Sequence, residues 1–209
     1  EHRPPLPQPS MRAAESVVDK VQMQQCILAS ASPRRVELLQ QIGLQFAVRP
    51  SDIDERLLGD EQPGDYVQRL AIEKARAQDA PGQLVIAADT IVLIDQSILG
   101  KPTDKAQGLE MLMRLSGRSH QVMTGVALSG PGGLITQTVV STVRFKPFDR
   151  DFAERYWASG EPKDKAGSYG VQGLGAVFIE HLEGSYSNVM GLPLFETAQM
   201  LETMGVRII

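Results

Sequence analysis

Short apolar runs alternate with segments of helical periodicity along this chain from Cys26 onward. Apolar runs of about four to eight residues are typical of buried strands, whereas apolar residues three and four positions apart mark one face of a helix. This alternation constrains the fold more than any other feature, because it predicts an α/β domain in which helices cover a sheet. The chain has 209 residues, which fits one such domain, and we expect that domain to span residues 25–209.

Residues 1–24 precede this pattern and differ from it. They hold several prolines followed by a mildly helical, polar stretch, and they lack the apolar core of a signal peptide. We expect them to form a tail that is disordered or partly helical, and we assign it no function.

The alternation also places the individual elements. Strands are expected at 26–29, 46–48, 84–94, 122–128, 134–145 and 176–181, and helices at 33–42, 64–78, 105–116, 149–159 and 194–204. Ser32 and Asp104 have side chains that are preferred at helix N-caps, and Pro33 suits a first helical turn. Residues 130–133, Gly-Pro-Gly-Gly, have the composition of a tight turn. The strands on either side of this turn are therefore expected to pair antiparallel.

Charge and composition exclude several classes of protein. The chain carries 21 Lys plus Arg against 25 Asp plus Glu, a net charge of −4, so no overall positive field would attract nucleic acid or an anionic membrane. Its apolar runs are far shorter than the roughly 18 residues that a membrane-spanning helix needs. Cys26 is the only cysteine, which excludes an intrachain disulfide and a Cys-rich zinc site and favours a reducing, cytoplasmic location.

The first candidate site is the segment from Ser30 to Arg35, where a strand ends and a helix begins. The amides of a first helical turn have no partners within the helix and carry partial positive charge, so phosphate oxygens are stabilised there. Arg34 and Arg35 oppose the helix dipole at this position. Their placement is favourable if an external polyanion accepts hydrogen bonds from both guanidinium groups. The alternative is a pair of solvated arginines on an exposed turn.

The second candidate is Asp89, which is followed by Thr90 and lies inside a long apolar run. Burial of an unpaired carboxylate is costly, so such a residue needs a cation or a metal, or serves as a base. It could equally mark a bend between two strands, and both interpretations stay open. Glu55, Lys74 and Lys101 are further charged candidates, although each taken singly is commoner as solvated surface.

The remaining sequence motifs mainly exclude known classes of catalytic and nucleotide-binding site. The glycines at 170, 173 and 175 permit close backbone approach to a ligand, although a glycine-rich structural turn is an equal alternative, and their order is not the dinucleotide-binding fingerprint. The chain has no P-loop, no H-E-x-x-H and no G-x-S-x-G sequence, and its three histidines have no paired-ligand spacing. Hydrolytic triads and His-rich zinc sites are therefore not expected.

Several ordered motifs resemble those of one known family, the Maf nucleotide pyrophosphatases. They comprise ILASASPRR at 27–35, EKA at 73–75, ADT at 88–90, LGKP at 99–102, LSG at 115–117, DKAG at 164–167 and NVMGLP at 188–193. The resemblance covers the chain from Gln25 to its end. It implies hydrolysis of a nucleoside triphosphate to the monophosphate and pyrophosphate, with a divalent metal. It also implies a fold like that of the inosine triphosphatases, with a mixed, elongated sheet, flanking helices and two lobes around a cleft.

The resemblance also assigns roles to individual residues. Asp89 matches the position of the proton acceptor. The phosphate-binding positions correspond to Ser30, Arg35, Lys74 and Lys101. Glu55 matches an acidic position and, together with Asp89, is the candidate ligand for Mg²⁺ or Mn²⁺, which take oxygen ligands.

Three specificity positions of the family correspond to Arg34, Thr90 and Gln172. All three are similar to the subgroup that prefers dTTP and UTP, and differ from the Trp, Gln and Glu typical of the subgroup that acts on 7-methyl-GTP. The neutral amide of Gln172 could both donate to and accept from the edge of a uracil or thymine base.

The expected partner is thus a nucleoside triphosphate, with neither nucleic acid nor membrane, and a homodimer is possible. Two alternatives are the same reaction on another base, such as 7-methyl-GTP, and a nucleotide-binding regulator of cell division, since the family has also been linked to septum inhibition.

Overall fold

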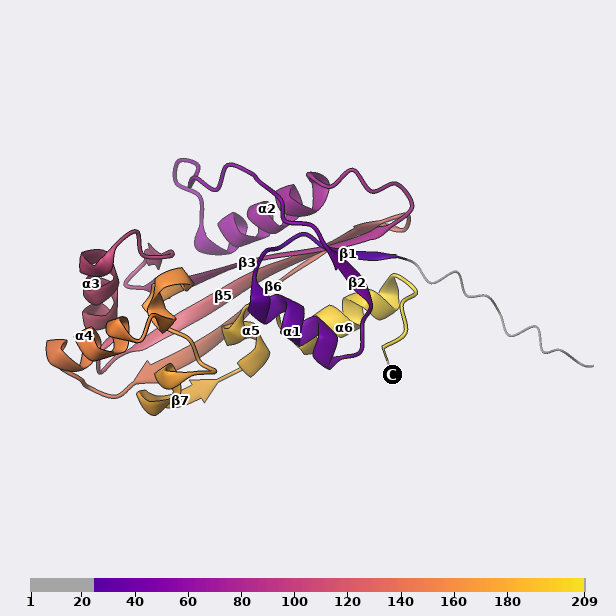
Figure 1. Ribbon diagram of the computed structural model, residues 1–209. Helices are drawn as coiled ribbons and strands as arrows, with labels where there is room; N and C mark the ends of the chain where they lie inside the picture. The colour runs from indigo at the N-terminus through magenta and orange to yellow at the C-terminus, as the bar shows by residue number, and fades with distance from the viewer. Residues whose placement is uncertain (1–24, 209) are drawn as a thin grey trace, which may run out of the picture.

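Figure 1 shows the computed structural model of the chain, in which residues 25–208 are described. The expected tail, residues 1–24, lies outside the described residues. The extent of the single domain expected over 25–209 stays a prediction.

A seven-stranded mixed sheet forms the centre of the molecule, with the order β2-β1-β3-β5-β6-β7 and with β4 paired to β3. The strands are β1 (Cys26–Leu28), β2 (Phe46–Val48), β3 (Leu84–Ile94), β4 (Ser97–Leu99), β5 (Ser119–Gly130), β6 (Gly133–Phe145) and β7 (Ile179–Glu183). Both neighbours of β1 run parallel to it, whereas β5 is antiparallel to β3 and to β6. The expected mixed sheet and the antiparallel hairpin are confirmed.

Helices flank the sheet on both faces and at one end (Figure 1). The helices are α1 (Pro33–Gln41), α2 (Pro63–Arg76), α3 (Lys105–Leu115), α4 (Arg150–Ala158), α5 (Tyr186–Met190) and α6 (Leu194–Thr203). α2 covers one face, α1 and α6 lie on the opposite face, and α3 and α4 pack together at the far end of the long strands. The expected α/β class is therefore confirmed.

The long strand β3 is buried on both faces, and its residues alternate between two hydrophobic clusters. Leu84, Ile86 and Ala88 pack in the cluster that includes α1 and α6. Val85 and Ala87 pack instead with alanines of α2. Because side chains alternate along a strand, the next two residues continue the pattern. Asp89 faces α2 and Thr90 faces α1.

The hydrophobic core has a second large cluster beyond this point. Val92 of β3 packs there with Leu112 of α3, Phe145 of β6 and Tyr156 of α4. β3 and β5 run through both clusters, so the two ends of the sheet carry separate cores around one pair of strands.

The structure departs from the expected elements near β7, which begins at Ile179 rather than at residue 176. Residues Leu174–Val177 form a 3-10 turn instead. Two short elements were also not expected. β4 follows a turn in which Asp95 and Gln96 have φ of 49° and 62° without glycine. α5 has only five residues, capped by Ser185 and ended by Gly191, and is too short to show periodicity.

Close packing of α2 on the sheet depends on Gly125. This residue lies opposite Asp89 in the β3–β5 ladder. A Cβ atom at Gly125 would overlap the backbone carbonyl of Val67 in α2. The absence of a side chain at this point lets α2 approach the sheet, which brings Lys74 within reach of Asp89.

We expect Gly125→Ala to lower the free energy of unfolding by about 1–3 kcal/mol, the usual cost of overpacking, and to reduce activity because α2 must shift. Denaturant unfolding and steady-state kinetics measure the two effects. Gly64→Ala is the control, since a Cβ there meets no atom within 4 Å and alanine is the better helix former. Equal stability of the two variants would contradict the close-packing role.

Candidate active site

A cavity of about 610 Å³ is lined by members of both large core clusters, Val171 and Met190 of the cluster at α1 and α6 and Val92 and Tyr169 of the cluster at α3 and α4. Eight of the expected site residues line it: Ser30, Arg34, Arg35, Glu55, Lys74, Asp89, Thr90 and Lys101. Gln172 is exposed and lies outside the lining, although the preceding residues Gly170 and Val171 belong to it. The structure thus gathers residues from α1, β3, α2 and several loops at one site.

Lys74 lies at the centre of the charged groups. Its Nζ is 2.7 Å from Oδ1 of Asp89 and 2.7 Å from Oε1 of Glu55. The side chains of Lys74 and Asp89 are 11% and 13% exposed, whereas that of Glu55 is 57% exposed. The ammonium group therefore offsets the charge of a largely buried carboxylate, which otherwise would be costly to bury.

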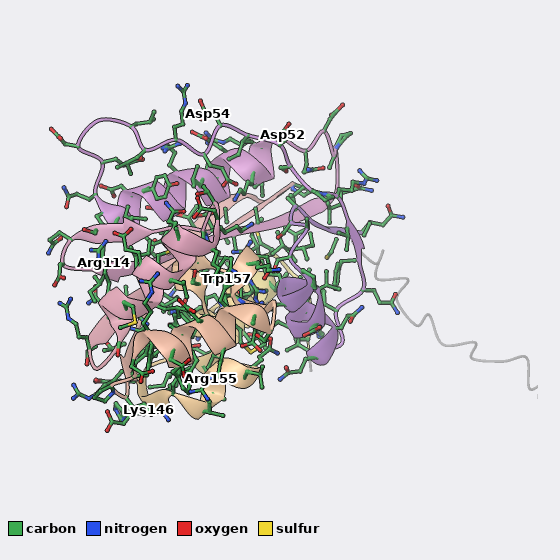
Figure 2. The ribbon with its side chains drawn as sticks, turned by 60° about the vertical axis from the view of Figure 1, so that its left-hand side comes forward. Asp52, Asp54, Arg114, Lys146, Arg155 and Trp157 are labelled. Carbon is green, nitrogen blue, oxygen red and sulfur yellow. The ribbon has the colours of Figure 1, made fainter. Side chains whose placement is uncertain are left out.

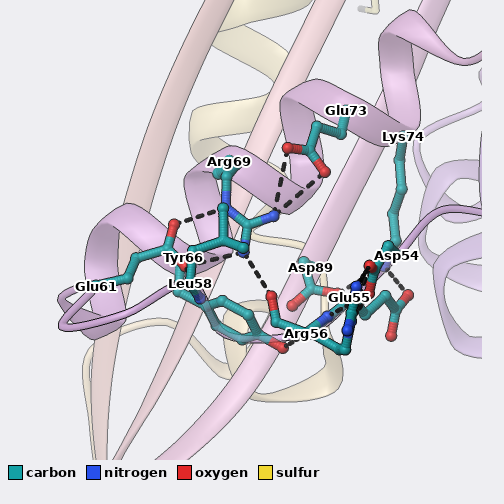
Figure 3. Close-up of polar contacts among 10 residues, drawn as sticks. All are labelled: Asp54, Glu55, Arg56, Leu58, Glu61, Tyr66, Arg69, Glu73, Lys74 and Asp89. Atoms are coloured by element: carbon teal, nitrogen blue, oxygen red, sulfur yellow. Dashed lines mark hydrogen bonds and ion pairs between the residues drawn. The ribbon is translucent and has the colours of Figure 1, made fainter.

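Glu55 comes from the loop between β2 and α2. Polar contacts hold this loop against α2 (Figure 3). The Tyr66 hydroxyl donates to the backbone carbonyl of Glu55 at 2.7 Å. Arg69 donates to both carboxylate oxygens of Glu61 and to the carbonyl of Arg56. These bonds fix the backbone of the loop, so Glu55 is presented to Lys74 from a defined position.

The other acidic residues of this loop are oriented differently. Asp52 and Asp54 are exposed at the outer edge of the molecule (Figure 2), and Asp54 forms an ion pair with Arg56. The acidic run at 52–55 therefore contributes one carboxylate to the cavity.

Arg35 occupies the opposite side of β3. Its Nε donates to the carbonyl of Gly191 at 2.8 Å, Nη1 to Oγ of Ser30 at 3.2 Å, and Nη2 to Oγ1 of Thr90 at 3.0 Å. Burial lowers the pKa of Arg35, and Arg34 acts in the same direction, whereas Asp89 and Glu55 oppose the shift. Thr90 also contacts Thr124 Oγ1 at 2.8 Å. Thr90 therefore holds the guanidinium group in place.

The start of α1 is open to an anion. Ser32 is the N-cap and makes no capping bond with its side chain, and the first turn holds no acidic residue. The Ser32 amide donates to Oγ of Ser30 instead. Residues 32–35 of this turn line the cavity, and first-turn amides are groups that stabilise an anion. The anion site expected here stays a prediction.

Gly191 supplies a carbonyl because α5 ends there with φ of 117°, a conformation that suits glycine. The buried Asn188 anchors α5 to the sheet by donating to the Val122 carbonyl and to Ser141 Oγ. These contacts give the motif NVMGLP a structural role, since they place the carbonyl that orients Arg35.

Several lining residues were missed by the sequence analysis. Tyr66, Asp164, Lys165 and Tyr169 line the cavity. Nη1 of Arg34 lies 3.8 Å from Oδ2 of Asp164, and Nζ of Lys165 donates to Oδ1 of Asp164 at 2.9 Å. The motif DKAG includes Asp164 and Lys165. A single sequence does not show, however, that residues 164–169 lie next to residues 30–35 in the fold.

The donor set is suited to a hard divalent cation. Two carboxylates, Asp89 and Glu55, converge on the ammonium nitrogen of Lys74, and carboxylate oxygens are also ligands of Mg²⁺ and Mn²⁺. Among the residues 25–208, no group of three or more His, Cys, Asp or Glu is placed to hold a metal ion. A metal here would take its remaining ligands from water and substrate, as Mg²⁺ often does.

Together, the mixed sheet and the cavity with cations on two walls define an α/β protein with a candidate binding site for a polyanion. The chain belongs to the Maf-like protein family, whose model matches residues 25–204. A relative from Alkalilimnicola ehrlichii, named dTTP/UTP pyrophosphatase, is 53% identical over 187 residues, or 86% of this chain and 92% of the relative. A relative from Symbiobacterium thermophilum with the same name is 50% identical, over 88% and 95% of the two chains.

The solved structure of the Staphylococcus aureus Ham1 protein matches 58% of this chain and 72% of its own, at 17% identity and a TM-score of 0.41. Within residues 25–208, every helix is too short or too polar to cross a bilayer.

Behind the cavity wall lies His120, whose Nε2 is 2.7 Å from the hydroxyl of Tyr169. Its ring packs edge-on against Phe145 and Tyr169. Burial lowers the pKa of His120 to about 4. Because this is below the ordinary value of about 6.5, the unfolded chain binds more protons than the folded one between these pH values.

The stabilising effect of neutral His120 is therefore present above about pH 6.5 and is lost as the pH falls toward about 4. We expect His120→Gln to lower the free energy of unfolding at about pH 7. Between about pH 7 and about pH 5, this free energy should fall less in the variant than in the wild type. Denaturant midpoints at about pH 7 and about pH 5 measure this, with the exposed His181→Gln as control. An unchanged pH dependence in His120→Gln would contradict the assignment.

Proposed function

We propose that this protein hydrolyses dTTP and UTP to the nucleoside monophosphate and pyrophosphate. The observation that carries the proposal is the ion pair of Lys74 and Asp89 inside the cavity, with Arg35 and the start of α1 beside it. This arrangement combines a carboxylate that can accept a proton with groups that stabilise a polyanion. The names of the relatives supply the substrates.

The triphosphate would lie along the cations. Arg35, Lys74 and Lys101 are assigned to its oxygens, and Ser30 and the first-turn amides of α1 contribute neutral donors. Pyrophosphate leaves as a polyanion, so positive groups fixed in advance stabilise the charge that develops on the leaving oxygen.

Asp89 is assigned the role of proton acceptor. In this step the oxygen of a water molecule forms a bond to the α-phosphorus, and the bond from that phosphorus to the bridging oxygen breaks. The proton of the water passes to Asp89, and the electron pair of the broken bond leaves with pyrophosphate. The hydrogen bond from Lys74 to Oδ1 orients the carboxylate for this step.

Glu55 and Asp89 are the residues that would hold a divalent metal, Mg²⁺ or Mn²⁺. When bound, such an ion offsets charge on the phosphate oxygens and orients them. Lys74 already forms ion pairs with both carboxylates, so its ammonium group would have to move aside or share them with a bound metal.

Base selection is assigned to Arg34, Thr90 and Gln172. The contacts of Thr90 support an indirect role, because its hydroxyl accepts from Arg35. Gln172 is the residue we assign to the base edge, since its exposed amide follows two residues that line the cavity. We also place the reaction in the cytoplasm, as expected from the single cysteine, and keep a homodimer as a prediction.

We expect Asp89→Asn to lower kcat at least about 100-fold, the scale of a lost general base. Product analysis should find pyrophosphate from dTTP and UTP in the wild type, dependent on Mg²⁺ or Mn²⁺ and lost on chelation. Asp95→Asn is the matched control, since this exposed aspartate follows β3 and pairs with Arg118 outside the cavity. Inorganic phosphate as the first product, or tight nucleotide binding without turnover, would instead favour the regulator of cell division.

Gln172→Glu should lower the preference for UTP over 7-methyl-GTP, because a carboxylate can only accept hydrogen bonds whereas the uracil edge needs a donor as well. The ratio of kcat/KM for the two substrates measures this. Lys163→Gln, on an exposed turn, is the control for a local change in charge. An unchanged ratio in Gln172→Glu would remove Gln172 from base selection.

A further inference from the structure

The glycine-rich segment 170–175, which carries Gln172, is attached to one carboxylate. Glu161 accepts hydrogen bonds at both of its oxygens. The amide of Leu174 donates to Oε2 at 2.7 Å, and the amide of Gly175 donates to Oε1 at 2.9 Å. These bonds fix the end of the segment at the start of its 3-10 turn.

Tyr156 of α4 fixes the beginning of the same segment. Its hydroxyl donates to Oε1 of Glu161 at 2.7 Å and accepts from the amide of Gly170 at 3.0 Å. One hydrogen-bonded pair of side chains therefore holds both ends of the segment, and Gln172 lies between the two attachment points.

The glycines of this segment serve this attachment. A Cβ atom at Gly173 would overlap the carboxylate of Glu161, and one at Gly175 would overlap the carbonyl of Gly170. The sequence left open whether these glycines allow close approach to a ligand or form a structural turn, and the groups that they approach are Glu161 and the segment itself.

The charge of Glu161 is also supported. Burial alone would raise the pKa of Glu161, but the hydrogen bonds from Tyr156, Gly175 and Leu174 and the charge of Lys165 outweigh burial, so the pKa is lowered. Lys165 lines the cavity and donates to the backbone carbonyl of Glu161 at 2.7 Å. The ionised carboxylate is the form that accepts all three donors.

We propose that Glu161 and Tyr156 are positioning residues for base selection: they hold the segment 170–175 so that Gln172 faces the nucleotide base. The inference rests on the proposed function, because it assumes that Gln172 contacts the base. It assigns neither residue to the chemical step, since the proposed proton acceptor Asp89 lies on β3 and the proposed phosphate-binding residues Arg35 and Lys74 lie on α1 and α2.

The test uses Glu161→Gln and Tyr156→Phe. In Glu161→Gln the new NH₂ group opposes a backbone amide, and in Tyr156→Phe the Gly170 amide loses its acceptor while the ring stays in the core. We expect KM for UTP and dTTP to rise about tenfold with kcat changed less than about threefold, and the preference for UTP over CTP and 7-methyl-GTP to fall. Inhibition by inorganic tripolyphosphate, which has no base, should stay unchanged.

Glu154→Gln is the matched control. It removes the charge of a glutamate on α4 itself. The carboxylate of Glu154 pairs with Arg150, away from the cavity. A purely structural role of Glu161 would instead weaken tripolyphosphate and nucleotide alike and lower kcat.

A double-mutant cycle with Gln172→Ala separates the possible failures. If Glu161 acts through Gln172, adding Glu161→Gln to Gln172→Ala should change the selectivity ratio less than about twofold further. Selectivity retained in both Glu161→Gln and Tyr156→Phe, or fully additive losses, would overturn the positioning role alone. A wild-type enzyme without preference for pyrimidines would overturn the proposed function and this inference with it.

Discussion

The contact between the ammonium group of Lys74 and the carboxylates of Asp89 and Glu55 is the interaction on which the site depends. Asp89 lies inside an apolar strand, where an unpaired carboxylate would be costly. The pairing requires α2 to lie close to the sheet, which Gly125 permits, and requires the loop before α2 to be attached, which Tyr66 and Arg69 provide. Packing, loop structure and charge are therefore parts of one arrangement.

The pleat of β3 separates two tasks. One face presents Asp89 to the cation on α2, and the other presents Thr90 to Arg35, whose remaining donors meet Ser30 and the carbonyl of Gly191. The carboxylate of Asp89 and the guanidinium group of Arg35, the groups proposed as proton acceptor and anion-binding group, are thus neighbours in space that share no hydrogen bond. Each can be supported by its own surroundings, α2 in one case and α1 with α5 in the other.

The sequence predicts β3, the β5–β6 hairpin and the start of α3, because local patterns determine these elements. The patterns are an apolar run, a glycine-rich turn and the N-cap residue Asp104. It cannot reveal the partner of Asp89, since the approach of α2 is a tertiary fact. The predicted start of β7 was wrong. Ala176 and Val177 are apolar, as in a strand, but the hydrogen bond from the Gly175 amide to Glu161 holds that segment in a 3-10 helix. Glu161 itself has no sequence signal beyond an ordinary charged residue after a glycine.

The alternation along β3 also limits how a gene for such a protein can change. Loss or gain of one codon between Leu84 and Asp89 would exchange the faces of Asp89 and Thr90 and separate both from their partners. Single-residue changes in the length of this strand are thereby closed to descendants of the chain. The loops at the rim of the cavity are under no such parity constraint, so new preferences for a base can arise there by small insertions while the reaction itself is inherited intact.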